Sequence, residues 1–145
     1  LQIPPEMYRE IFKPRQKKWI EFVRARTNAK IFLHCDGAVE PILKDFIEIG
    51  IDVLNPLQTS ARGMEPEKIK KLYGKNLRFW GGGVDTQSTL PFGSLEQIRN
   101  EVRYRLELLS EGNGYVFGTI HNIQPDIPPE KVLAVFETVC EYNSR

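Results

Sequence analysis

The chain has 145 residues, of which 41% are hydrophobic and 27% are charged, and 20 basic side chains oppose 19 acidic ones. This balance is typical of a globular domain and gives no reason to expect a nucleic acid or an anionic membrane as a partner. No apolar run approaches the ~20 residues of a transmembrane helix. The two cysteines, Cys35 and Cys140, lie far apart in the sequence, so we expect reduced thiols and a cytoplasmic location.

The beginning of the sequence has the character of an internal segment. Residue 1 is Leu, and residues 1–6 read as a loop that enters a helix, whereas a natural terminus is commonly polar and loosely held. We therefore expect the sequence to be a piece of a longer protein.

Apolar spacing predicts one helix followed by four strand–helix units. Recurrence every three or four residues marks the helices, and short apolar runs mark the strands. Pro14 should kink or split the first helix, and a Ser94–Gln97 capping box should start the longest one. The predicted order is helix 5–27, strand 29–34, helix 40–49, strand 51–57, helix 65–73, strand 77–80, helix 94–112, strand 114–118 and a helix from 128 onward.

Apolar strands that alternate with helices predict an α/β fold with a parallel sheet. Four units of this size make about half of the ~250 residues of a (β/α)8 barrel, the TIM barrel. Half a barrel leaves two unpaired strand edges. We therefore expect either a missing half that completes it or self-association.

Polar side chains follow the carboxyl end of each predicted strand, where parallel α/β proteins place their active sites. Both histidines, His34 and His121, fall there, and we expect them to face one pocket that takes a small-molecule substrate. Each could equally satisfy only local backbone groups. Alternation along the strand puts Asp36 on the side of His34 and turns Cys35 toward the helices. Predicted substrate contacts at the same end are Asn55, Gln58, Gln87, Asn122 and Gln124.

Two further features lie at this end of the predicted sheet. His34, Asp36 and His121 form a candidate zinc site, because three protein ligands with an open fourth position are typical of catalytic zinc. The glycine run at residues 81–83 lacks a phosphate-loop signature and is predicted to permit close backbone approach. Asp85, just beyond it, is a candidate catalytic residue together with His121, with a turn-stabilising role as the alternative.

Five segments carry a family pattern: residues 32–37 (FLHCDG), 50–58 (GIDVLNPLQ), 81–87 (GGGVDTQ), 90–93 (LPFG) and 121–126 (HNIQPD). With them the sequence resembles the uroporphyrinogen decarboxylase superfamily over essentially the whole chain. The resemblance implies a (β/α)8 barrel of which residues 1–145 form the C-terminal half. It also implies one of two chemistries: cofactor-free decarboxylation of uroporphyrinogen III to coproporphyrinogen III in porphyrin biosynthesis, or zinc-dependent methyl transfer from a corrinoid to a thiol.

Residues 34–39 (HCDGAV) resemble the methyltransferase branch more closely, which favours methyl transfer. In that branch two cysteines and a histidine bind zinc; here His34, Asp36 and His121 stand near those places, so the sequence departs from the pattern. This interpretation implies a corrinoid protein as a partner. In the decarboxylase alternative no metal is needed, and His121 resembles a histidine that contacts a propionate. A third alternative is a non-catalytic barrel module, because a barrel scaffold does not guarantee chemistry.

Overall fold

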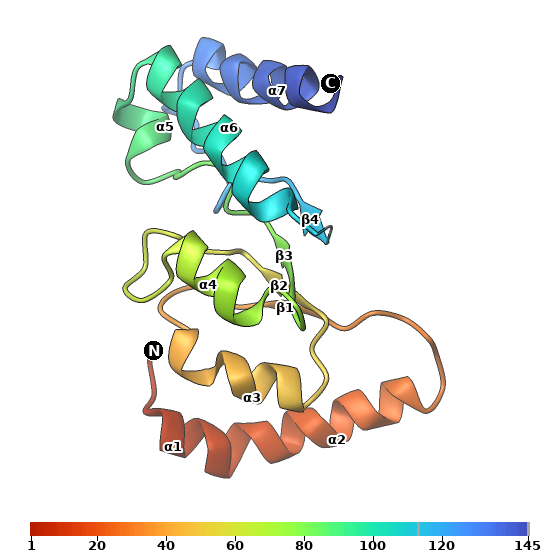
Figure 1. Cartoon of the computed structure of the whole chain (residues 1–145). Helices are drawn as coiled ribbons and strands as arrows, with labels where there is room; N and C mark the ends of the chain where they lie inside the picture. Colours follow the sequence, from red (N-terminus) through yellow and green to blue (C-terminus); the bar gives the residue numbers. More distant parts are fainter. Residues whose placement is uncertain (113, 145) are drawn as a thin grey trace.

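The computed structural model describes residues 1–112 and 114–144, and within them four strands form one parallel sheet (Figure 1). Each strand pairs with the next in sequence, in the order β1-β2-β3-β4. Four parallel strands alternating with helices confirm the predicted α/β fold and match part of a (β/α)8 barrel. The strands are β1 (Phe32–His34), β2 (Val53–Asn55), β3 (Arg78–Trp80) and β4 (Tyr115–Val116).

Helices precede β1 and follow every strand. The capping box is confirmed: the Ser94 hydroxyl accepts from the Gln97 amide at 3.2 Å, and the Gln97 side chain accepts from the Ser94 amide at 2.7 Å. The short α5 was not predicted. The helical segments are α1 (Pro5–Met7), the π-helical turn η1 (Tyr8–Phe12), α2 (Lys13–Arg24), the 3-10 turn η2 (Glu40–Ile42), α3 (Leu43–Glu48), α4 (Pro66–Tyr73), α5 (Thr89–Phe92), α6 (Leu95–Ser110) and α7 (Pro129–Asn143).

Pro14 is accommodated without a break in the first helix. Residues 5–24 run through α1, η1 and α2 in one stretch, which ends before the predicted Thr27. Proline has no N–H to donate, and its ring crowds the carbonyl four residues earlier. The π-helical turn lies just ahead of it, and there the Lys13 amide bonds the Tyr8 carbonyl, five residues back. This wider turn relieves the crowding that would otherwise split the helix.

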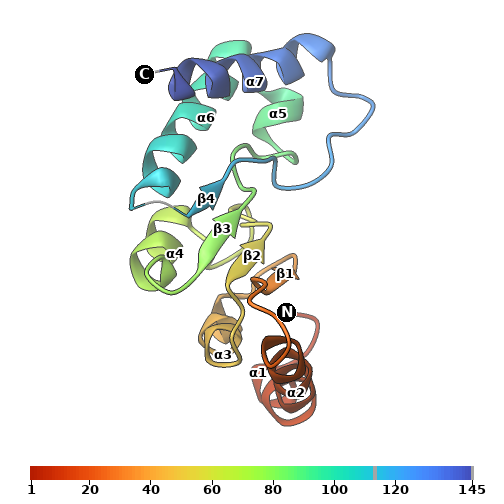
Figure 2. The ribbon, with the colours of Figure 1, turned by 90° about the vertical axis from the view of Figure 1, so that its right-hand side faces the viewer.

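One face of the sheet packs against helices. Leu33, Leu54 and Phe79 are cross-strand neighbours in the register. Leu54 and Phe79 are 0% and 1% exposed, and they join a core cluster with side chains of α3 and α4. Figure 2 shows these two helices on one side of the row of strands. We call this side the core face.

The opposite face of the sheet is uncovered by any helix in the described part of the chain (Figure 2). Phe32, Trp80 and Val116 point to it and remain 47%, 43% and 43% exposed. The rings of Phe32 and Trp80 meet edge to face, with centroids 5.3 Å apart. We call this side the open face, and it corresponds to the interior of a complete barrel.

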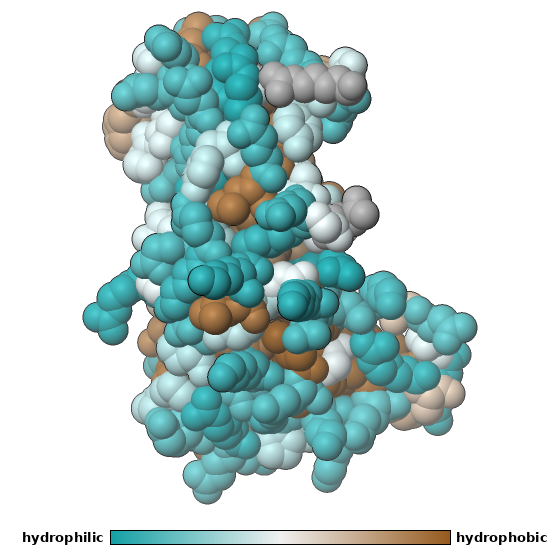
Figure 3. Space-filling model, viewed as in Figure 1, coloured by the Kyte–Doolittle hydropathy of each residue, from teal (hydrophilic) through white to brown (hydrophobic). Residues whose placement is uncertain are grey.

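A second core cluster lies between α6 and α7, around Ile98, Val102 and Val135. The outer surface seen in Figure 3 is mainly hydrophilic, with hydrophobic side chains showing chiefly in the seams between elements. None of the helices described combines the length and the apolar character needed to cross a bilayer.

Candidate active site at the carboxyl ends of the strands

A chain of hydrogen bonds links the ends of the first three strands on the open face. Nε2 of His34 lies 3.0 Å from Oδ2 of Asp36, and Nδ1 lies 2.7 Å from Oδ1 of Asn55. Nδ2 of Asn55 then donates to the main-chain carbonyl of Trp80 at 3.1 Å. His34 therefore joins β1 to β2, and Asn55 joins β2 to β3.

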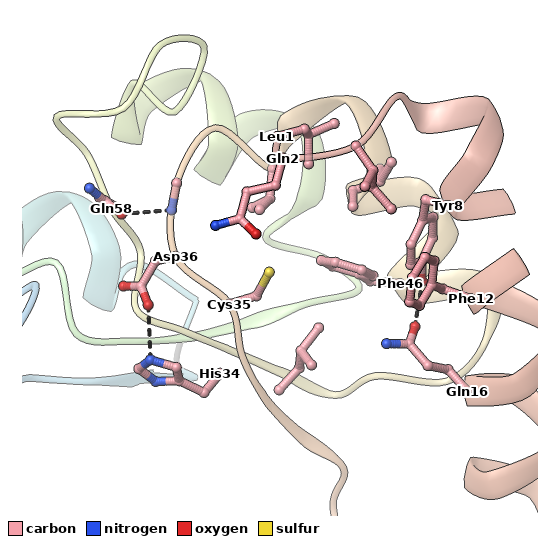
Figure 4. A pocket seen from close by; sticks show the side chains of 15 residues that line it. Leu1, Gln2, Tyr8, Phe12, Gln16, His34, Cys35, Asp36, Phe46 and Gln58 are labelled. Carbon is pink, nitrogen blue, oxygen red and sulfur yellow. Dashed lines mark hydrogen bonds and ion pairs between the residues drawn. The ribbon is translucent and has the colours of Figure 1, made fainter.

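Cys35 points to the other side of β1, as the alternation predicts. Figure 4 shows its sulfur directed into a cavity toward Phe46, whereas the His34–Asp36 pair is directed away. Burial raises the pKa of the Cys35 thiol, and the negative charge of Asp36 adds to this effect. A thiol with a raised pKa is a weak nucleophile, so Cys35 is a packing residue in this arrangement.

This cavity, of about 670 Å³, lies between the first helix and β1. Its walls are mostly apolar, and the hydroxyl of Tyr8 donates to Gln16 at 2.7 Å beside it. His34 and Asp36 lie only at the edge of this cavity (Figure 4). The cavity and the hydrogen-bonded chain therefore lie on opposite sides of β1.

Two of the predicted substrate contacts fasten loops to one another. Oε1 of Gln58 accepts from the Gly37 amide at 2.6 Å, which ties the loop after β2 to the loop after β1. Oε1 of Gln87 accepts from the Ser60 hydroxyl at 3.3 Å. Direct contact of these two amides with a substrate stays a prediction.

Asp85 is 9% exposed, and its Oδ1 accepts from the Gln87 amide at 2.8 Å. This is the geometry of an Asx turn, the alternative that the sequence left open. The preceding glycines also behave as expected: a Cβ on Gly82 would lie 2.7 Å from the Leu57 carbonyl oxygen, and one on Gly83 would overlap the Phe117 ring. The loop after β3 is thus built by close packing.

The loop after β4 carries His121, Asn122 and Gln124, all exposed. The contacts that hold this loop go mainly to main-chain oxygens: Gln124 donates to the Asn122 carbonyl at 3.1 Å, and Thr119 donates to the His121 carbonyl at 2.6 Å. The catalytic role predicted for His121 stays a prediction.

The described residues do not assemble the three-ligand zinc site. They contain no group of three or more His, Cys, Asp or Glu side chains placed to hold a metal ion. The side chains of His34 and Asp36 are in contact, but both ring nitrogens of His34 already face oxygen acceptors. The donor set therefore does not fit the predicted zinc ion.

Sequence reasoning missed the groups that complete these contacts. The Trp80 carbonyl and the Gly37 amide belong to the main chain, so residue type carries no trace of their role. Ser60 lies in an exposed loop and had no spacing that distinguished it. Only their location near the carboxyl ends of the strands connected these residues with the candidate site.

The fold is that of a parallel α/β protein of the barrel type, with polar side chains at the carboxyl ends of its strands. We call this edge of the sheet the rim. A family profile described as Uroporphyrinogen decarboxylase (URO-D) matches residues 1–142, so the chain belongs to the uroporphyrinogen decarboxylase family.

Two curated relatives are each named uroporphyrinogen decarboxylase. The protein of Methylococcus capsulatus is 48% identical over 48 residues, which are 33% of this chain and 14% of that protein. The protein of Pseudoalteromonas translucida is 40% identical over 53 residues, which are 37% of this chain and 15% of that protein. The matched segments thus cover only a small part of each relative's length.

Proposed function

We propose that the chain is part of an enzyme that decarboxylates uroporphyrinogen to coproporphyrinogen without a metal. The observation that carries the proposal is the family match over residues 1–142, with two relatives named for this activity. Methyl transfer, which the sequence alone favoured, has less support, because the donor set at the rim does not fit zinc. A corrinoid protein is accordingly not part of the proposal.

The substrate carries several carboxylates, which bind best to N–H donors. His34 and His121 offer such donors at the two outer strands of the sheet, and Asn122 adds an amide beside His121. All three side chains are exposed at the carboxyl ends of the strands. We assign them to holding the acidic side groups of the substrate.

Loss of CO2 leaves an electron pair that a protonated pyrrole ring can accept, and a nearby carboxylate stabilises the cationic ring. Asp36 is the carboxylate of the rim, with its side chain 46% exposed. Asp85, within the loop after β3, is 9% exposed. Asp36 is therefore better placed to meet a substrate, and we assign Asp85 to holding the loop that carries Gln87.

The test is conversion of uroporphyrinogen by the natural full-length protein in a buffer with a metal chelator. We expect CO2 release and a product with fewer carboxyl groups, separated by chromatography. His121→Gln should raise KM, whereas Asp126→Asn, a substitution at another exposed residue of the same loop, should change it little. Absence of conversion contradicts the proposal. Zinc-dependent methyl transfer to a thiol would favour the other branch, and neither activity would favour a non-catalytic module.

A further inference from the structure

Asn55 has contacts that differ from the substrate contact predicted for it. It ends β2 and lies between His34 at the end of β1 and Trp80 at the end of β3. Its Nδ2 donates to the Trp80 carbonyl at 3.1 Å, and its Oδ1 lies 2.7 Å from Nδ1 of His34. Both polar atoms of the side chain are thus engaged within the protein.

The bond to Trp80 determines which way the Asn55 amide faces. A main-chain carbonyl only accepts hydrogen bonds, so the NH2 group must face Trp80 and Oδ1 must face His34. The amide oxygen also only accepts, so Nδ1 of His34 has to carry the hydrogen. Turning the amide over would place oxygen against oxygen at Trp80 and break that bond.

Asp36 holds the other ring nitrogen less firmly. Its Oδ2 lies 3.0 Å from Nε2, and the Asp36 and His34 side chains are 46% and 58% exposed. An exposed contact of this kind is exchanged for water at little cost. The orientation of the His34 ring is therefore set mainly from the Nδ1 side, by Asn55.

We propose that Asn55 is a positioning residue that keeps a hydrogen on Nδ1 of His34 and leaves Nε2 facing Asp36 and the substrate. A hydrogen bond to one ring nitrogen commonly decides the state of the other. The ring geometry does not depend on the enzymatic activity. The consequence for catalysis rests on the proposed function.

The first test is 15N NMR of the histidine rings in the full-length protein, with a chelator present. A His34→Gln variant identifies the His34 signals by their loss. In the wild type we expect a hydrogen on Nδ1, which faces the amide oxygen of Asn55, and Nε2 needs a hydrogen of its own while it donates to the Asp36 carboxylate. In Asn55→Ala, Nδ1 loses its acceptor, so the 15N signal of Nδ1 should move toward that of a ring nitrogen without hydrogen.

Two variants serve as controls. Asn55→Asp loses the bond to the Trp80 carbonyl but keeps an oxygen acceptor opposite Nδ1, so it should retain the hydrogen on Nδ1. Gln87→Ala removes an amide that bonds Ser60 instead of His34, and it should leave the signals unchanged. If Asn55→Ala does not fold, Asn55→Ser provides the same readout. Identical ring signals in the wild type and in a folded Asn55→Ala or Asn55→Ser variant overturn the proposal.

The second test is decarboxylation kinetics with the full-length protein. Because Asn55 acts through His34, Asn55→Ala should change kcat and KM for uroporphyrinogen in the same direction as His34→Ala and should add little in the double variant. Additive effects of the two substitutions would make Asn55 a substrate contact in its own right and overturn the proposal. Wild-type protein that has the expected ring signals but no activity would contradict the proposed function and leave the role of Asn55 intact.

Discussion

The core face and the open face of the sheet use alternate residues of the same short strands for different purposes. Leu54 and Phe79 on the core face are almost fully buried, whereas Phe32 and Trp80 on the open face are nearly half exposed. The hydrogen-bonded chain of Asp36, His34 and Asn55 lies on the open face. Since successive side chains point to opposite faces, three-residue strands suffice to build both a core and a site.

This contrast explains why stability and activity should respond to different substitutions. Removing a buried side chain leaves a cavity on the core face, whereas truncation on the open face removes little buried surface.

The strongest contrast is between two phenylalanines on opposite faces of the sheet, Phe79 in β3 and Phe32 in β1. Phe79→Ala should lower the free energy of unfolding by about 3–5 kcal/mol, because Phe79 is 1% exposed. Phe32→Ala should cost about 0.5–1.5 kcal/mol, mainly from the lost contact with Trp80. Denaturant unfolding of both variants measures the difference. Equal losses would show that the open face is as well packed as the core face.

Ion pairs fasten the first helix to the core-face helix α3 through Asp45, which is 4% exposed. Arg9 and Lys13 bond its carboxylate at 3.0 and 2.7 Å. Asp45→Asn should cost about 1.5–3 kcal/mol at pH 7, the range for hydrogen bonds to charged groups. Glu48→Gln is the matched control, because Glu48 also pairs with Lys13 but is 64% exposed.

The effect of Asp45 should depend on pH with a defined sign. Burial alone would raise the pKa of Asp45, but the bonds from Lys13 and Arg9 outweigh burial and hold it below the usual value. A lowered pKa in the folded state means that the stabilisation is complete above the unfolded pKa of about 3.9 and is lost as the pH falls through the folded value. Unfolding at several pH values should show the wild type and Asp45→Asn converging below about pH 4. A constant difference down to pH 2 would contradict the assignment.

The smallest effect concerns α6, whose start is capped by Ser94. Ser94→Ala should lower stability by about 1 kcal/mol, because it leaves a helix N–H group without its partner. Ser88→Ala is the control, since Ser88 precedes α5 without a side-chain cap bond. Thermal unfolding distinguishes the two, and equal melting temperatures would remove the capping box from the account.

Much of the fold was predictable because it follows from local patterns. Apolar runs gave the four strands in order, glycine and serine marked helix ends, and the alternation of His34, Cys35 and Asp36 gave their sides correctly. The π-helical turn ahead of Pro14 was not predictable, because a break and a wider turn both relieve the same crowding.

The candidate site was predictable only as a region. Strand ends located His34 and Asn55, but pairing across strands decides that Asn55 bonds the Trp80 carbonyl, and a main-chain acceptor has no sequence pattern. The described residues contain no group of three or more metal-ligating side chains that would join His34 and His121 in one metal site. His34 ends β1 and His121 comes after β4, and these outermost strands have two strands between them.

The most direct test compares His34→Ala with Leu54→Ala, two substitutions on opposite faces of paired strands, in the full-length protein. We expect His34→Ala to lower kcat/KM for uroporphyrinogen at least about tenfold while the free energy of unfolding changes by less than about 1 kcal/mol. Leu54→Ala should lose about 2–5 kcal/mol of stability and retain the activity of the fraction that stays folded. Unchanged kcat/KM in a folded His34→Ala protein would contradict the claim that the open face carries the site.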